Sequence, residues 1–278
     1  MRGVGLRLTA GIFDTPAYSA LAGAREECYT HAGNGMQYSK LYYKADVVAS
    51  MDSARVIVPI VVDLLHPKSV IDFGCGMGTW LSVFKENGVG DMLGIDGHWV
   101  RPGALFIDPE CFVAADLTQP IDPPRRFDLA MSLEVAEHLP SDRAGTFVES
   151  IIRAAPAVLF SAAIPFQGGL RHFNEQWPAY WAQLFRERGY RCIDCIRERI
   201  WNDPRVTYWY AQNTLLFVDE HSLPEYPSLA EMERRTSEPL PLVHPEAYTG
   251  LAKYKLLNLH HLFYIWRKVR GARQSRKA

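Results

Sequence analysis

The residues best suited to chemistry form a short acidic turn with histidines. The segment LEVAEHL places Glu137 three residues and His138 four residues after Glu134. If a helical turn begins at Glu134, these spacings put two carboxylates and an imidazole on one face. A second histidine, His172, follows in a loop beside two glycines. Oxygen and nitrogen ligands of this kind suit a divalent ion such as magnesium or manganese.

The same side chains also allow chemistry without a metal. A histidine that titrates near neutrality and reaches a hydroxyl can act as a general base, which makes His172 and His138 the predicted catalytic groups. An acidic turn after a strand can also cap the next helix. The sequence leaves both interpretations open: a metal site of Glu134, Glu137, His138 and His172, or a histidine base beside a structural turn.

A second chemical feature is the glycine loop in VIDFGCGMGTW. Gly74, Gly76 and Gly78 follow an apolar run directly and precede a helical stretch. Glycines at such a turn let the backbone pass close to a ligand and expose amides at the start of a helix. A dinucleotide fingerprint needs a glycine where Thr79 stands. The loop therefore argues against a nicotinamide enzyme.

Three aspartates accompany the glycine loop. Asp72 stands two residues before the first glycine, Asp96 ends the next apolar run and Asp116 ends the one after. Because ligands bind at the carboxyl edge of a doubly wound sheet, we expect these acids to lie there together with the loop. A carboxylate at the position of Asp96 can accept hydrogen bonds from both hydroxyls of a ribose.

This order of motifs resembles the class I methyltransferases that use S-adenosylmethionine, over about residues 69 to 218. The resemblance implies that the three loop glycines accommodate the methionine part of the cofactor. It implies further that Asp72 contacts the methionine amine, Asp96 the ribose and Asp116 the adenine amino group. Weaker cofactor-binding candidates, by adjacency, are Gly97, His98 and Leu117.

The set Glu134, Glu137, His138 and His172 resembles the metal site of the plant small-RNA 2′-O-methyltransferases. Its E-x-x-E-H part also resembles the ubiquinone-pathway O-methyltransferases. The resemblance implies that Mg²⁺, or Mn²⁺, binds both these residues and oxygens of the acceptor. Such an ion lowers the pKa of a hydroxyl and orients a vicinal diol for attack on the sulfonium methyl. We therefore expect a metal-assisted O-methyltransferase that acts on a sugar, glycan or polyol.

Three other functions remain open on the sequence. One is a metal-independent methyltransferase for a small O- or N-acceptor, another is an RNA 2′-O-methyltransferase, and the third is a cofactor-binding partner subunit without catalysis. The near balance of 30 Lys+Arg against 31 Asp+Glu argues against a large nucleic-acid surface.

To bring these groups to one edge, the chain needs a parallel sheet with helices on both faces. Alternating apolar runs and helical stretches predict strands at 69–73, 92–96, 111–115, 127–132, 157–162, 190–197 and 208–218. Helices are predicted at 53–65, 79–87, 141–154 and 177–188. Ser141 should cap the third of these, and Pro59 should kink the first.

The fold class that follows is α/β, with a Rossmann-like, seven-stranded, mostly parallel sheet and a C-terminal helical extension. The last two predicted strands are close in sequence, which indicates an antiparallel edge after five parallel strands. We predict a lead-in or lid at residues 1–45, the methyltransferase domain at 46–220, and an extension with a basic tail at 221–278.

The end of the chain is locally basic. Residues 251–278 contain eight Lys and Arg and no acid. We expect a docked terminal helix with a solvated end, although contact with a membrane surface, nucleic acid or a partner subunit remains open, as does a homodimer. The charge-free stretch 154–170 contains two prolines and two glycines and makes a poor transmembrane helix.

The remaining signals concern cysteines and aromatic residues. Five scattered cysteines favour a reducing compartment, and with no convincing signal peptide we expect the cytoplasm. Cys192 and Cys195 are expected to be structural, because no second pair completes a zinc site. Core packing is expected for four aromatics at helical spacing, the first two of which can also wall the acceptor site: Trp177, Tyr180, Trp181 and Phe185.

Overall fold

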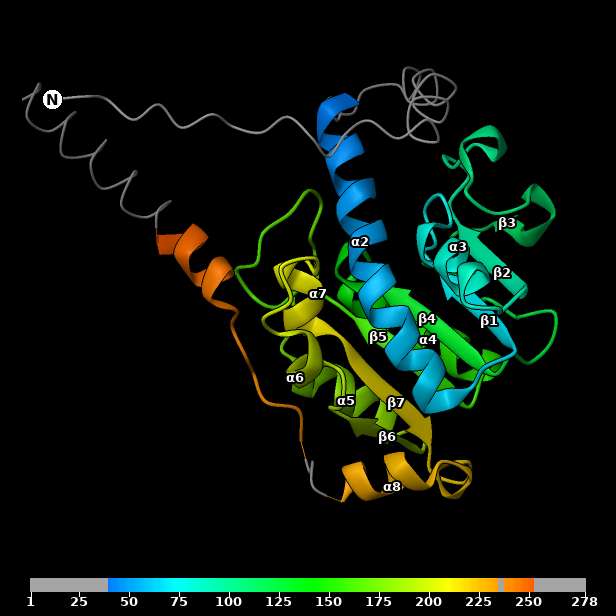
Figure 1. The fold of residues 1–278 in the computed structure, drawn as a ribbon, viewed down its shortest axis with the longest axis vertical. Helices are drawn as coiled ribbons and strands as arrows, with labels where there is room; N and C mark the ends of the chain where they lie inside the picture. Colours follow the sequence, from blue (N-terminus) through cyan, green and yellow to red (C-terminus); the bar gives the residue numbers. More distant parts are fainter. Residues whose placement is uncertain (1–39, 235–237, 253–278) are drawn as a thin grey trace, which may run out of the picture.

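A computed structural model describes residues 40–234 and 238–252 of the chain. One mixed sheet forms the centre of this part, and helices cover it on both sides (Figure 1). The first 39 residues of the predicted lead-in and residues 253–278 of the predicted basic tail lie outside the described residues.

The sheet has seven strands in the order β3-β2-β1-β4-β5-β7-β6. The first five are parallel, whereas β7 runs antiparallel to both β5 and β6. This confirms the predicted Rossmann-like sheet with an antiparallel last strand. The strands are β1 (Ser69–Phe73), β2 (Asp91–Asp96), β3 (Phe112–Ala114), β4 (Leu129–Leu133), β5 (Ala157–Ser161), β6 (Tyr190–Ile193) and β7 (Leu215–Asp219).

The central strands are short apolar runs because both faces of the sheet are covered. Every residue of β1, β4 and β5 is buried. Side chains alternate between the faces, so Leu129 joins one hydrophobic core and its neighbour Ala130 joins the other. The carboxyl ends of β1, β2 and β4 therefore meet at one edge, as the sequence predicts.

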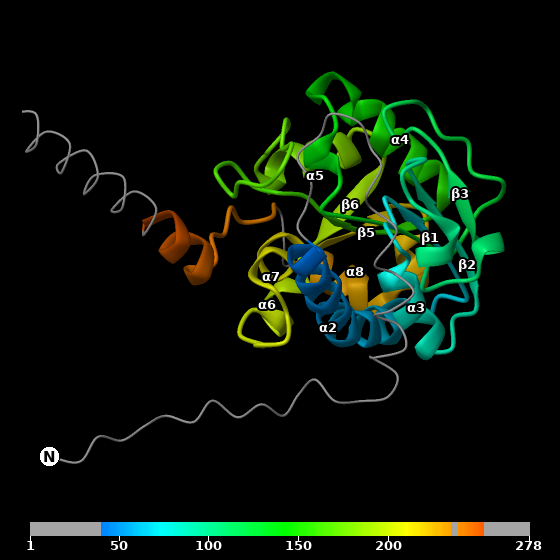
Figure 2. The same cartoon turned by 90° about the horizontal axis from the view of Figure 1, so that it is seen from above.

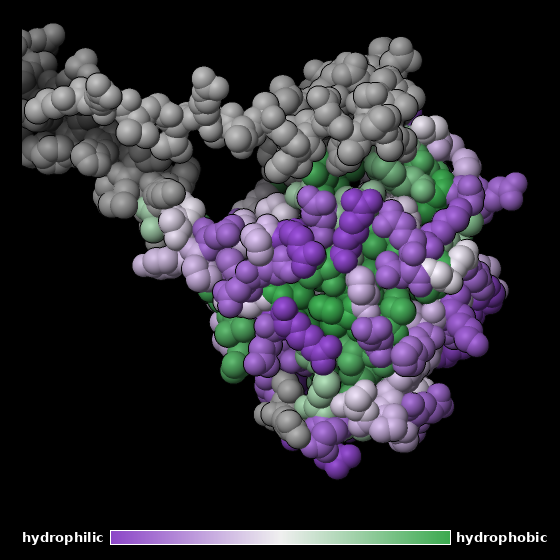
Figure 3. All heavy atoms as spheres, in the orientation of Figure 1, coloured by the Kyte–Doolittle hydropathy of each residue, from purple (hydrophilic) through white to green (hydrophobic). Residues whose placement is uncertain are grey.

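The helices divide into two layers (Figure 2). Core residues on one face come from α2 (Lys40–Leu65), α3 (Thr79–Glu86), α6 (Arg197–Ile200), α7 (Tyr208–Asn213) and α8 (Pro227–Glu233). The opposite face is covered by α4 (Ala144–Ala154) and α5 (Pro178–Arg186). Hydrophobic side chains, green in Figure 3, gather where Figure 1 has α2, whose Val56 and Ile60 are only half-buried.

The C-terminal extension begins after β7 with a 3-10 turn, η5 (Leu223–Glu225), and α8. Leu229 of α8 is fully buried, and α8 packs against β6. A further helix covers residues 245–252. Within the described part of the chain, no helix is both long and apolar enough to cross a membrane.

Several predicted boundaries are wrong. The predicted strand 208–218 is helical over Tyr208–Asn213, because the buried amides at the end of α7 hydrogen-bond to the functional site. The strand predicted to reach residue 197 stops at Ile193, since Arg197 starts α6 and pairs with Asp194.

Two helix starts also differ from the prediction. Helix α2 begins at Lys40, so residues 40–45 are helical and not an irregular lead-in. Ser141 is not a helix cap, because it opens the 3-10 turn η4 (Ser141–Arg143) and α4 starts at Ala144 without a side-chain cap.

Candidate functional site

The glycine loop joins β1 to α3 in left-handed backbone conformations. Gly74, Gly76 and Gly78 have φ values of +89°, +54° and +75°. A Cβ at Gly74 would lie 2.3 Å from Val135 Cγ2, and one at Gly78 would lie 2.8 Å from Ile107 Cγ1. At Gly76 no atom of the described residues lies within 4 Å of that position, so this part of the structure leaves the loop open there. Only glycine fits the first and third positions, and the middle one can face a ligand.

Two buried aspartates support this loop. Asp96, at the end of β2, accepts the Gly76 N–H at 2.7 Å with Oδ2 and the Gly97 N–H at 2.6 Å with Oδ1. Burial raises the pKa of Asp96, and these two amides oppose the shift. Asp72 lies on the neighbouring strand, β1. Burial, followed by the charge of Asp96, raises the pKa of Asp72 well above its ordinary value. The two carboxylates make the loop a suitable place for hydroxyls and an ammonium group.

The third predicted acid lies on the surface. Asp116 is exposed, and its Oδ1 accepts the backbone N–H and the hydroxyl of Thr118 at 2.9 and 2.7 Å. These bonds lower its pKa. Leu117 beside it is buried in the core. The other predicted cofactor residues here are Gly97, which is buried against the ring of Trp99, and the exposed His98.

The acidic turn after β4 does not form the helical turn expected to begin at Glu134. Glu134 has a φ of +55°, and the turn is a 3-10 helix, η3 (Ala136–His138). It nevertheless brings three of the four predicted ligands together. One ligand atom from each of Glu137, His138 and His172 lies within 4.8 Å of the others.

Glu137 is the most unusual residue of this cluster. Its side chain is completely buried, and no described residue makes a well-aligned hydrogen bond to either carboxylate oxygen, although the backbone N–H groups of Glu137 and Ala163 lie near enough to oppose the shift of its pKa. Burial raises its pKa well above the ordinary value, and the charge of Glu134 adds to the shift. A carboxylate in this environment is stable only if it binds a proton or a cation. The orphaned oxygens beside two imidazoles therefore fit a divalent ion.

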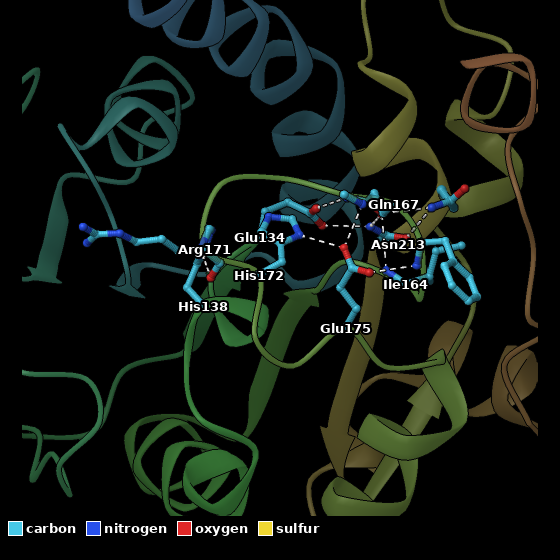
Figure 4. A network of polar contacts seen from close by, with 11 residues as sticks. Glu134, His138, Ile164, Gln167, Arg171, His172, Glu175 and Asn213 are labelled. Carbon is cyan, nitrogen blue, oxygen red and sulfur yellow. Dashed lines mark hydrogen bonds and ion pairs between the residues drawn. The ribbon is translucent and has the colours of Figure 1, made fainter. Parts of the chain in front are cut away.

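The two histidines meet edge to face, with ring centroids 4.8 Å apart. Nδ1 of His138 lies 3.3 Å from the carbonyl oxygen of Arg171, and Nδ1 of His172 lies 3.0 Å from Oε1 of Glu175 (Figure 4). Nε2 of His172 lies against Gly169, where a Cβ would come within 2.1 Å of it. Burial, followed by the nearby His172, lowers the pKa of His138. We therefore expect His138 to be neutral at pH 7 and able to bind a metal or accept a proton.

Glu175 organises the loop that carries His172, a role that the sequence analysis missed. Its Oε1 also accepts the Gly168 N–H at 2.8 Å, and its Oε2 accepts the Phe166 N–H at 2.8 Å. Phe166 and Gly168 both have positive φ values. A single carboxylate thus holds the backbone N–H groups of two left-handed loop residues and Nδ1 of the His172 ring. In the sequence, the position of Glu175 three residues after His172 could have indicated this role.

We expect Glu175→Ala to loosen this loop. A hydrogen bond to a charged group contributes about 1.5–3 kcal/mol, so amide exchange at Phe166 and Gly168 should accelerate roughly 10- to 100-fold. Hydrogen-exchange NMR or mass spectrometry measures the rates, and Glu187→Ala, which removes an exposed glutamate, is the matched control. Unchanged exchange at both amides would contradict the role assigned to Glu175.

Glu134, the fourth predicted ligand, is held by side-chain amides. Gln167 Nε2 donates to Oε2 at 2.9 Å and Asn213 Nδ2 donates to Oε1 at 3.0 Å. Burial raises the pKa of Glu134, and these amides oppose the shift. Each oxygen accepts one amide hydrogen and keeps a lone pair. The predicted strand over residues 208–218 concealed Asn213, although the polar pair in WYAQNTLLF interrupts that apolar run.

The residues that the sequence analysis regarded as structural lie away from this cluster. Cys192 and Cys195 are free thiols, and burial raises the pKa of Cys195 to about 11. Trp181 and Phe185 are buried in the core, as expected. Trp177 is 39% exposed and Tyr180 is half-buried, so these two aromatics are not full members of the core.

Residues 54–161 match a family model described as a methyltransferase domain. No curated protein matches the chain. The structure is similar to the methyltransferase domain of a bacterial Hen1, CtHen1-C, with 20% identity, a TM-score of 0.45, and coverage of 61% of this chain and 97% of that one.

Two further solved structures are similar at low identity. Magnesium protoporphyrin IX methyltransferase from Synechocystis PCC 6803 is 17% identical, with a TM-score of 0.45 over 66% of this chain and 90% of that one. DesVI from Streptomyces venezuelae is 15% identical, with a TM-score of 0.49 over 64% of this chain and 95% of that one.

Proposed function

We propose that the chain is a class I S-adenosylmethionine-dependent methyltransferase that methylates a hydroxyl of a sugar, glycan or other polyol with the help of a divalent ion; the match of residues 54–161 to a methyltransferase-domain model and the order of the sheet support this. Glu137, His138 and His172 would hold Mg²⁺ or Mn²⁺, with Glu134 adjacent. The observation that carries this proposal is the fully buried Glu137 carboxylate, which makes no well-aligned hydrogen bond to a described residue and has ligand atoms of His138 and His172 within 4.8 Å.

The cofactor side of the proposal uses the glycine loop. The cofactor supplies an electrophilic methyl group on its sulfonium. The open backbone at Gly76 would lie against its methionine part, Asp72 would pair with its amine and Asp96 would accept its ribose hydroxyls. Asp96 already accepts one amide hydrogen on each oxygen, and a carboxylate has lone pairs left for two hydroxyls. Asp116 and Leu117 would contact the adenine.

The metal-binding residues would act on the acceptor oxygen. A bound divalent ion lowers the pKa of a hydroxyl and fixes its orientation. The buried Glu137 would compensate the charge of that ion. The carboxylate of Glu175 holds Nδ1 of His172 and so fixes the orientation of the imidazole ring. The loop of His172 completes the acceptor side of the site.

The acceptor class follows from the surface beside this cluster. Phe166 and Phe173 are 78% and 68% exposed on the loop that carries His172. Exposed aromatic faces next to hydroxyl-binding groups suit the C–H face of a sugar ring. For the location we propose the cytoplasm, because the five scattered cysteines suit a reducing compartment.

A second candidate mechanism needs no metal. Burial lowers the pKa of His138, so its imidazole is neutral at pH 7 and can accept the proton of an acceptor hydroxyl. In that case Glu137 keeps its proton, and the cluster only shapes the site.

Chelation distinguishes the two mechanisms. After dialysis against EDTA we expect methyl transfer to a panel of sugars and polyols to fall by about 100-fold or more, and Mn²⁺ or Mg²⁺ to restore it, because loss of a metal removes several kcal/mol of charge stabilisation. Binding of S-adenosylhomocysteine, measured by calorimetry, should not change.

Full activity after complete chelation would reject the metal and favour His138 as base. A crystal grown with S-adenosylhomocysteine and Mn²⁺ provides a second test, since anomalous scattering should peak among Glu137, His138 and His172. An absent peak at saturating Mn²⁺ would exclude the metal site.

A further inference from the structure

A cluster of three side-chain amides lies behind Glu134. Gln167 comes from the loop after β5, whereas Gln212 and Asn213 end α7 and are 0% and 3% exposed. Figure 4 shows Gln167 and Asn213 converging on the carboxylate of Glu134. Fully buried amides are costly unless every donor is used, so their hydrogen bonds determine what this cluster can do.

The hydrogen bonds of the cluster run in one direction. Asn213 Nδ2 donates to Glu134 Oε1 at 3.0 Å and to Gln167 Oε1 at 2.9 Å. Gln212 Nε2 donates to Gln167 Oε1 at 3.1 Å and to Asn213 Oδ1 at 3.0 Å. Because an ionised carboxylate can only accept, Glu134 fixes the orientation of the amides that contact it, and these fix the next one. No amide can rotate without breaking bonds of its neighbours.

Gln212 extends this network to the C-terminal strap, which we define as residues 238–244. Its Oε1 accepts the N–H of His244 at 2.8 Å. Its backbone oxygen accepts Nη1 of Arg197 at 3.2 Å, and the same Nη1 donates to the carbonyl of Leu240 at 2.9 Å. The ring of His244 anchors the strap, because its Nε2 lies 3.0 Å from the carbonyl of Trp201 and its ring packs 4.8 Å from that indole.

We propose that Gln212 is a positioning residue that couples docking of the C-terminal strap to the position of Glu134, and thereby to cation binding. This inference rests on the metal site of the proposed function. Glu134 sits in a left-handed conformation that a non-glycine residue adopts only when its surroundings hold it. If the strap leaves, Gln212 Oε1 loses the hydrogen bond that it accepts from the His244 N–H. Gln212 is then less firmly held, and so are Gln167 and Asn213, the two amides that it contacts and that orient Glu134.

Two variants test the coupling without changing a ligand. Gln212→Met keeps the shape of the side chain and removes its bonds, and His244→Ala weakens the strap at a distance from the cluster. Gln176→Met, from the same loop as Gln167, and His221→Ala, an exposed histidine, are the matched controls. The probe is MnCl₂, with affinity and the electron paramagnetic resonance spectrum of the bound ion measured on the full chain.

We expect the Mn²⁺ dissociation constant to rise about 10-fold in Gln212→Met, the lower end of the effect of losing an outer partner of a metal ligand, because Gln212 acts on Glu134 through Gln167 and Asn213. His244→Ala should raise it by less. The spectrum of bound Mn²⁺ should change in both, while S-adenosylhomocysteine affinity stays within twofold and the controls match wild type. Unchanged Mn²⁺ affinity in His244→Ala and in folded Gln212→Met would overturn the coupling.

The outcome for the wild type separates the two proposals. Wild type that binds no Mn²⁺ would reject the metal site, and the coupling is then measured by trypsin cleavage after Arg171, an exposed residue in the loop that Gln167 holds. Faster cleavage in Gln212→Met and His244→Ala than in their controls supports the coupling. Equal cleavage rates refute it.

Discussion

Replacing Glu137 by glutamine is expected to make the protein more stable at neutral pH and to weaken its binding of a divalent ion. No described residue makes a well-aligned hydrogen bond to this fully buried carboxylate, so the ionised wild type bears a desolvation cost that a neutral amide of the same shape avoids. The amide is equally short of partners, so the gain is the part of the cost that belongs to the charge, about 1–3 kcal/mol. For a domain of this size that corresponds to a rise in Tm of roughly 2–12 °C, measured by calorimetry.

The pH dependence of this gain has a definite sign. Burial raises the pKa of Glu137 in the folded state above the value of about 4.3 that glutamate has in an unfolded chain. A group with a raised folded pKa contributes its full stability below the unfolded pKa and loses it as pH rises through the folded pKa. Wild type should therefore match Glu137→Gln near pH 4 and fall increasingly below it toward neutrality.

Divalent ions should reverse this order. Saturating Mn²⁺ stabilises wild type by binding only the folded state, and Glu137→Gln should show at least about a hundredfold weaker binding, the upper end of the loss seen for outer partners alone. Glu110→Gln, at an exposed position, is the control for loss of a charge. If Glu137→Gln is destabilised at pH 7 and still binds Mn²⁺ like wild type, the carboxylate has an unseen partner and is no ligand.

The sequence predicted the sheet and the edge that carries the glycine loop because these depend on local patterns. Short apolar runs such as those around Val70 and Leu129 are buried on both faces, and their spacing indicates parallel strands. The glycines after β1 mark positive φ values that few other residues adopt. The positions of Asp72 and Asp96 then follow from strand ends, because parallel strands terminate at a common edge.

The second half of the site was only partly predictable, because it is built from contacts between distant segments. Glu134 meets Asn213, which lies 79 residues further along the chain, and no local periodicity records that bond. The same bond explains why residues before Thr214 are not strand. The left-handed conformation of Glu134 likewise follows from its surroundings, so the spacing of E-x-x-E-H correctly joined Glu137 with His138 but placed Glu134 on a helical turn that does not exist.

Gly74→Ala is expected to cause the largest loss of stability, because Gly74 of the glycine loop packs against Val135 of the acidic turn. A Cβ at this position would lie 2.3 Å from one methyl of Val135 and 2.8 Å from the other, at a φ of +89°. The left-handed conformation costs an alanine about 1–2 kcal/mol and overpacking about 1–3 kcal/mol. The free energy of unfolding in urea should therefore fall by about 2–5 kcal/mol.

Gly76→Ala separates the two contributions, because its φ is also positive while no atom of the described residues lies within 4 Å of the new methyl. It should lose only the conformational part, about 1–2 kcal/mol. Adding Val135→Ala to Gly74→Ala removes the clash and should recover most of the difference between the two glycine variants. Since Val135 stands between Glu134 and Glu137, Gly74→Ala should also weaken Mn²⁺ binding, and Gly76→Ala should not. Equal stability of the two glycine variants would mean that the loop and the acidic turn do not constrain each other.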